Sequence, residues 1–228
     1  MTTMPRGRGL AAWSCFGLVL LAMLWMQRLP TPLPVDADPA QFSALRARAV
    51  LDHALSDRLP HRLGTVANAR VRDRWIAAFA VLGLKAETRR RCVCADYGVC
   101  GEVDNVLVRI PGTVDGPAVL VTSHYDSVGA GPGASDAGAG VAALVEIARA
   151  LQHQDGPRRE VLLLASDGEE AGLLGAEAFV QEPEFGRVGV VVNVEARGTT
   201  GRASGFETQA GSAGLIGALA GNLPDAAL

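Results

Sequence analysis

The run AVLVTSHYDS at residues 118–127 is the part of the sequence that decides the fold. Its first half is short, apolar and partly β-branched, which is typical of a strand buried on both faces. His124 and Asp126 follow as soon as the apolar run ends. Ligands collect at the carboxyl ends of strands in open α/β sheets. The run therefore predicts both a buried strand and the edge of the sheet where a site would form.

Similar runs recur on either side of this one, and helical patterns separate them. The strand-like runs are NVLVRI at 105–110, VLLLAS at 161–166 and VGVVVNV at 188–194. Apolar residues at helical spacing or alanine-rich segments predict helices over 41–55, 66–82, 136–152 and 169–180. Alternation of strands and helices favours an α/β fold, a three-layer α/β/α sandwich with a mixed, mostly parallel sheet.

Polar residues follow two more of these strands. Asp136 comes after a glycine-rich loop, Glu169 and Glu170 come after the run at 161–166, and Glu195 comes after the run at 188–194. Taken one at a time, such acids are usually helix caps or dipole partners.

Together, these acids would repel each other at one sheet edge unless they were protonated or bridged by cations. A histidine nitrogen with carboxylate oxygens is a ligand set for zinc. Two metals about 3.5–4 Å apart would let several acids share a small volume and would polarise a carbonyl group.

Four motifs in this order resemble the M28 family of zinc aminopeptidases. They are HYDS, SDAGAG, DGEEAGLLGAEAF and NVEARGTTG, with Asp136 twelve positions after His124. The similarity runs from about 104 to 211 and is greatest to the membrane-anchored branch of endoplasmic reticulum and vacuolar-membrane metallopeptidases. It implies a zinc exopeptidase fold and hydrolysis of the N-terminal peptide bond of peptides with a free N-terminus.

The resemblance also implies a role for each acid, with two zinc ions in the complete enzyme. His124 and Glu195 would bind one zinc, Glu170 the second, and Asp136 would bridge both. A cis peptide bond is expected after Asp136.

Two further residues would act on the reaction without binding metal. Glu169 would be the general base, taking a proton from water and passing it to the leaving amine. Asp126 would orient the imidazole of His124.

One ligand of the family pattern is missing, a histidine beyond Glu195. The histidines present are His53, His61, His124 and His153, and we expect His53 and His61 to cap helices or lie on the surface. We therefore expect a C-terminally truncated chain that is weakly active or inactive. The alternatives are a natural short form acting as a non-catalytic binding module, or a relative of glutaminyl cyclases or carboxypeptidases.

The N-terminal part predicts attachment to a membrane. Residues 10–26 form an apolar run long enough for a span, so 1–28 is expected to be an uncleaved anchor rather than a signal peptide. Residues 29–40 contain several prolines and predict a stiff linker, which leaves 41–228 as the zinc peptidase domain. Arg6 and Arg8 favour a cytoplasmic N-terminus and an exported domain, periplasmic, extracellular or lumenal.

Composition and charge also limit the class of protein. Hydrophobic residues make up 49% and charged residues 20%, which excludes a disordered tail. A net charge of −3 gives no reason to expect nucleic acid as a partner. The spacing of Cys92, Cys94 and Cys100 matches no common zinc pattern, so these cysteines predict one structural disulfide and no metal site. Which two of the three form the disulfide stays open.

Overall fold

The computed structural model describes residues 6–26, 29–95, 98–196, 198, 205 and 208–222. The chain divides into two compact units. One contains residues 32–198, and the other combines residues 1–31 with residues 199–228.

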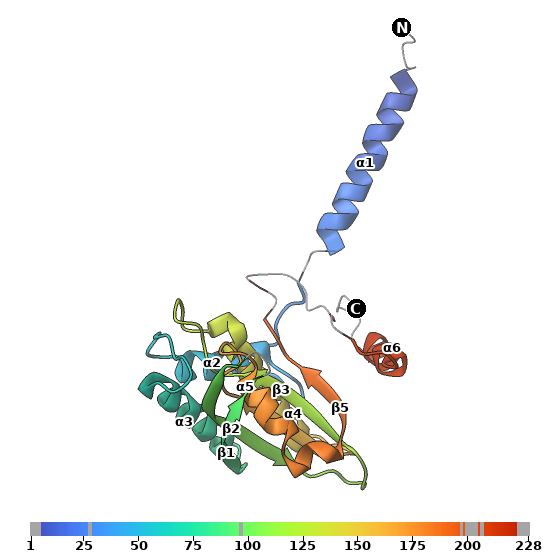
Figure 1. The fold of residues 1–228 in the computed structure, drawn as a ribbon. Coiled ribbons are helices and arrows are strands. Elements are labelled where there is room, and N and C mark those ends of the chain that lie inside the picture. The colour runs from blue at the N-terminus through green and yellow to red at the C-terminus, as the bar shows by residue number, and fades with distance from the viewer. Residues whose placement is uncertain are drawn as a thin grey trace. The chain divides into compact units, whose positions relative to one another are not determined.

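A five-stranded sheet forms the centre of the larger unit (Figure 1). Its strands lie in the order β1 (Ala86–Cys94), β2 (Cys100–Ile110), β4 (Val161–Ser166), β3 (Ala118–His124) and β5 (Val188–Asn193). Strands β3, β4 and β5 run parallel, whereas β2 is antiparallel to both β1 and β4. The expected mixed sheet is confirmed, with its parallel pairing confined to the three strands that end at the predicted site.

The β1–β2 hairpin was predicted only in part, because the strand expected over 105–110 begins earlier, at Cys100. Strand β1 was not predicted, because its sequence AETRRRCVC is polar and lies at the edge of the sheet. Cys94 and Cys100 face each other directly across the hairpin and form a disulfide. This confirms one disulfide in the cluster and leaves Cys92 free and exposed.

Helices cover both faces of the sheet and bury alternate residues of β2. Val106 and Val108 pack in a cluster with residues of α2 (Ala44–Ala54), α3 (Val66–Val81) and α4 (Ala139–Gln152). Leu107 faces the other way and packs with Phe179 of α5 (Leu174–Val180). Successive side chains of the central strands β2 and β4 point to opposite faces of the sheet and both faces are buried, which requires a layer of helices on each side.

The helix expected over 169–180 is much shorter in the structure. Helix α5 begins only at Leu174, so Glu169 and Glu170 lie on a turn-rich loop and not at a helix start. Gly168, Gly172 and Leu173 have φ angles of +69°, +120° and +58°, which no right-handed helix accommodates. The helix expected from Asp136 likewise begins at Ala139, after the one-turn π-helix η1 (Ala134–Gly138).

The proline-rich segment expected as a linker lies against the larger unit from Leu33 onward. Glu146 of α4 is buried and pairs with the guanidinium groups of both Arg46 and Arg149. These two arginines donate hydrogen bonds to backbone carbonyls of Val35, Ala37, Asp38, Pro39 and Gln41. We call Arg46, Glu146 and Arg149 the arginine clamp, because they fix residues 35–41 to α2 and α4.

The other unit contains two described helices, α1 (Arg6–Met26) and α6 (Ala213–Asn222). Among the residues whose structure is described, we find no helix that combines the length and the hydropathy needed to cross a bilayer.

Candidate metal centre

The segments that follow two parallel strands bring a histidine and two acids to one point of the larger unit. His124 is the last residue of β3, Asp136 lies in η1, and Glu170 lies in the loop after β4. One nitrogen of His124 and one carboxylate oxygen of each acid all lie within 4.8 Å of one another. These are three of the four metal ligands predicted from the sequence.

The remaining predicted residues surround the same imidazole. Nε2 of His124 lies 2.9 Å from Oδ1 of Asp136, 3.7 Å from Oε1 of Glu195 and 3.9 Å from Oε2 of Glu169. The His124 side chain is only 1% exposed, whereas Asp136 is 57% exposed. The imidazole is therefore a fixed, buried group at the floor of an open acidic site.

Asp126 connects the histidine to the glutamates. Its carbonyl oxygen lies 3.1 Å from Nδ1 of His124, and its carboxylate lies 3.4 Å from the same atom. A proton on Nδ1 would satisfy these acceptors and leave Nε2 free to bind a cation. The carboxylate also accepts the backbone N–H groups of Glu169 at 2.9 Å and Glu170 at 3.2 Å. Asp126 thus contacts both the histidine and the backbone of the two glutamates.

The acids of this site carry more negative charge than the protein alone balances. Burial raises the pKa of Glu169 and Glu170, and the neighbouring carboxylates raise it further. Burial alone would lower the pKa of His124, but Asp126, Glu169 and Glu195 outweigh it and raise the pKa to about 9. Without a metal, a proton on the imidazole is therefore the positive charge that these carboxylates share.

Comparison with known protein families identifies the family of this chain. The model of peptidase family M28 matches residues 105–227, which contain every residue of the site. The chain belongs to peptidase family M28.

Several curated relatives are similar over part of this M28 chain. A vacuolar membrane protease of Candida albicans is 37% identical over 150 residues, which cover 64% of this chain and 18% of that protein. A vacuolar membrane protease of Verticillium alfalfae is 45% identical over 91 residues, 40% of this chain and 9% of that protein. The matched part thus spans less than a fifth of these relatives' length.

Solved structures support the fold. A Zn-dependent exopeptidase from Parabacteroides distasonis superposes with a TM-score of 0.66 at 20% identity, covering 84% of this chain and 79% of that one. A glutaminyl cyclase from an Acidobacteriales bacterium gives 0.65 at 20% identity, covering 86% and 73%. The M28 chain therefore has the zinc exopeptidase fold.

The loop before α4 agrees with the M28 resemblance in its backbone. The peptide bond between Asp136 and Ala137 is cis. Gly138 N–H donates to the carbonyl of Gly133, and the hydroxyl of Ser123 at the end of β3 donates to the carbonyl of Ala137. These bonds hold the Asp136 turn against the strand that ends in His124.

The prediction that His61 caps a helix or lies on the surface is wrong, because this histidine is buried behind the site. His61 is 1% exposed, and its Nε2 lies 2.7 Å from the carbonyl oxygen of Tyr125, between His124 and Asp126. Its backbone N–H donates to Ser127 at 2.9 Å. His61 lies in an irregular segment between two helices, where no periodic pattern indicates burial. His53 and His153 are exposed.

Asp167 and Asn68 also lie behind the M28 site and were not predicted. The carboxylate of Asp167 is buried and accepts hydrogen bonds from the Asn68 side chain at 3.0 Å and the Asp104 N–H at 3.1 Å. Burial raises the pKa of Asp167. A charged residue directly after the strand-like run VLLLAS at 161–166 was the signal that could have found Asp167.

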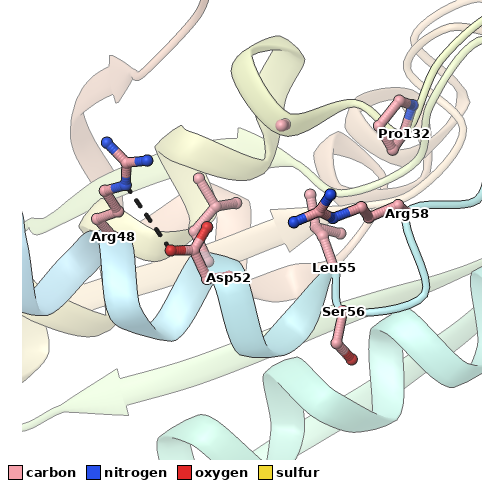
Figure 2. Close-up of a pocket in the computed structure, with 8 residues that line it drawn as sticks. Arg48, Asp52, Leu55, Ser56, Arg58 and Pro132 are labelled. Atoms are coloured by element: carbon pink, nitrogen blue, oxygen red, sulfur yellow. Dashed lines mark ion pairs between the residues drawn. The ribbon is translucent and has the colours of Figure 1, made fainter.

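A surface pocket of about 590 Å³ lies beside α2 and the loop that leads to Asp136 (Figure 2). Its walls include Arg48, Asp52, Leu55, Ser56, Arg58 and Pro132. Arg48 and Asp52 form an exposed ion pair at 3.7 Å. None of the six predicted site residues lines this pocket, so it is separate from the acidic site.

Proposed function

We propose that this M28 chain forms the core of a zinc-dependent exopeptidase that removes the N-terminal residue of peptides. The observation that carries the proposal is the convergence of His124, Asp136 and Glu170 within 4.8 Å at the ends of parallel strands. Glu195, after β5, approaches the same imidazole.

The donor set fits zinc. One imidazole nitrogen with carboxylate oxygens is a combination that zinc prefers. Burial raises the pKa of Glu170, and the neighbouring carboxylate of Asp136 raises it further, so a divalent cation would favour the ionised form. His124 and Glu195 would hold one ion and Glu170 a second, with Asp136 between them. Zinc bound here would polarise the scissile carbonyl and provide hydroxide near neutral pH.

Glu169 is the proposed general base. Partial burial raises the pKa of Glu169 towards neutral pH. A general base works best when its pKa lies near the pH of the reaction, because it must both accept and release a proton. The hydrogen bond from its backbone to Asp126 fixes the position of the chain at this residue. Glu169 takes a proton from the attacking water and passes it to the amine that leaves.

The acidic surroundings favour a substrate with a positive end. The site has five carboxylates, whose total charge exceeds that of two divalent ions, and Asp136 and Glu170 open it to solvent. An excess of carboxylates attracts the α-ammonium group of a free peptide N-terminus and disfavours a blocked one. This charge pattern supports an aminopeptidase rather than a carboxypeptidase.

Membrane association is a further part of the proposal. The relatives named vacuolar membrane protease support it, and Arg6 and Arg8 favour an exported catalytic unit. Protease protection in sealed vesicles tests it. In sealed vesicles whose cytoplasmic face points outward, residues 32–198 should resist external protease and be digested after lysis. This result is expected only if the unit is enclosed.

The central experiment uses the full chain stripped of metal with a chelator. Zinc is titrated by calorimetry, and products from a matched pair of peptides, one free and one acetylated at the N-terminus, are analysed by mass spectrometry. We expect zinc to bind and the free peptide alone to lose its first residue. Equal cleavage of both peptides would contradict an aminopeptidase.

Two variants separate the roles of the adjacent glutamates. Glu170→Gln should weaken zinc binding, whereas Glu169→Gln should bind zinc and lose turnover. Zinc binding by the wild type without cleavage of any peptide would favour the binding module. A peptide with N-terminal glutamine that loses ammonia without being shortened would favour a cyclase.

A further inference from the structure

The loop that carries Glu169 and Glu170 is closed at its base by one side chain. This loop runs from Asp167, directly after β4, to Gly175 in the first turn of α5. The amide of Asn105, on β2, lies between the two ends. Its Oδ1 accepts the N–H of Asp167 at 3.0 Å, and its Nδ2 donates to the carbonyl of Gly175 at 2.7 Å.

The two ends of the loop approach so closely that no side chain fits between them. A Cβ atom on Gly175 would overlap the carbonyl oxygen of Asp167 and lie 2.6 Å from Oδ1 of Asn105. Glycine is required at this position for steric reasons, although its backbone is helical. At the base of the loop, the backbone of Asp167 therefore packs directly against the backbone of Gly175, and the Asn105 amide is hydrogen-bonded to both residues.

The rest of the loop is held by hydrogen bonds as well. The N–H groups of Leu173 and Leu174 bond back to the carbonyls of Glu169 and Gly168, at 2.8 and 3.0 Å. The carboxylate of Asp126 accepts the N–H groups of both glutamates. Asp126 thus fixes the loop at its centre and Asn105 fixes it at its ends.

The burial of Asn105 indicates that these bonds matter. Asn105 is 0% exposed, and its strand neighbour Leu107 on the same face is packed among apolar side chains. A buried amide without partners is costly, so both of its polar atoms need hydrogen bonds. Both hydrogen-bond partners of the Asn105 side chain belong to the loop at 167–175, which carries Glu169 and Glu170, and neither belongs to the sheet.

We infer that Asn105 is a positioning residue, which holds Glu169 and Glu170 in the geometry that binds zinc and accepts the proton. The inference rests on the proposed function for its chemical consequence, but the closure of the loop is a property of the metal-free chain. Asn105 acts on the glutamates only through the backbone of residues 167–175.

The test compares Asn105→Ala with Leu107→Ala in the full chain. Leu107 is buried on the same strand and the same face, so its truncation controls for loss of stability without touching the loop. Hydrogen exchange of the metal-free proteins is followed by mass spectrometry. We expect amides of residues 168–174 to exchange roughly tenfold faster in Asn105→Ala, with β3 and β4 unchanged.

The second readout is affinity for zinc alone, measured by calorimetry. Loss of a residue that orients metal ligands weakens metal binding by about 10–100-fold. We expect a loss in this range for Asn105→Ala and a change below about twofold for Leu107→Ala.

A second variant keeps the inference testable if Asn105→Ala does not fold. Gly175→Ala forces the loop ends apart without removing the amide, and it should produce the same local increase in exchange. Loop amides that exchange at the wild-type rate in both variants, or that change only as in Leu107→Ala, would overturn the inference. Failure of the wild type to bind zinc would overturn the proposed function instead, since the exchange rates still show whether Asn105 holds the loop.

Discussion

Glu169 shows how a single residue of the site acts against the stability of the protein. Its carboxylate is about two-thirds buried among other acids, and the attraction of His124 does not compensate for this burial. A carboxyl group whose pKa is higher in the folded state binds its proton more tightly there. Ionisation at neutral pH therefore destabilises the folded chain, and this cost disappears in acid, where both states are protonated.

We predict that Glu169→Gln raises the melting temperature of the metal-free protein at pH 7. The amide keeps the shape and removes the charge. The gain should be small, because about a third of the side chain is exposed and solvent screens its interactions. It should shrink as the pH is lowered towards 4, because the wild-type carboxyl then takes up its proton. Thermal unfolding in chelator at both pH values checks this, and a variant less stable than wild type at pH 7 would contradict it.

The arginine clamp shows the opposite electrostatic behaviour at the level of two helices. Burial alone would raise the pKa of Glu146, but hydrogen bonds from Arg149, the Ser43 N–H and Arg46 outweigh it, and the pKa is lowered. A lowered pKa stabilises the folded state above the unfolded value of about 4.3. That stability is lost as the pH falls through the folded-state pKa.

We predict that Glu146→Gln destabilises the protein by about 3 kcal/mol at pH 7, because it leaves two arginines without their buried partner. The difference from wild type should begin to narrow as the pH falls below the unfolded-state value of about 4.3, and it should vanish only below the lower folded-state pKa, where Glu146 is protonated in the wild type too. The matched control is Asp52→Asn, which removes the exposed partner of Arg48 and should cost less than about 1 kcal/mol. Urea unfolding at pH 7 and pH 3.5 measures both; equal losses in the two variants would rule out a structural role for the clamp.

Elements with a regular hydrophobic pattern could be predicted, and irregular ones could not. The strand at 161–166 is entirely buried, so its apolar run was sufficient. Strand β1 carries three consecutive arginines, Arg89 to Arg91, and owes its place to pairing with β2 and not to its own propensity. The loop at 169–173 has the composition of a helix, but the left-handed residues Gly168, Gly172 and Leu173 prevent one.

At the scale of the whole molecule, the site joins strand ends that are far apart in the sequence. All six predicted site residues could be placed at one edge, because the parallel strands β3, β4 and β5 all end there. The layer behind them could not be predicted. Asn105, His61 and Asp167 contact the site segments through pairings that exist only in the folded chain.

We predict that zinc stabilises the whole larger unit, since its ligands come from three separate segments. A ligand that binds only the folded state adds about 2.7 kcal/mol at a concentration 100 times its dissociation constant. Melting curves of the metal-stripped chain, with and without zinc, should show this shift for the wild type. Glu170→Gln should reduce the shift, because one of the two proposed ions loses its ligand, and an equal shift in that variant would contradict a metal-binding role for Glu170.

The disulfide of the β1–β2 hairpin determines how the protein must be produced and stored. Reducing cytosol would keep Cys94 and Cys100 as thiols, so material made there would lack the covalent closure of the hairpin. Cys92 lies two positions from Cys94 on the same strand, exposed and free. Its thiolate could attack the bond, form a new pair with Cys100 and release Cys94. Samples made in an oxidising compartment and kept mildly acidic, or carrying Cys92→Ser, would avoid this isomerisation and give a single covalent species.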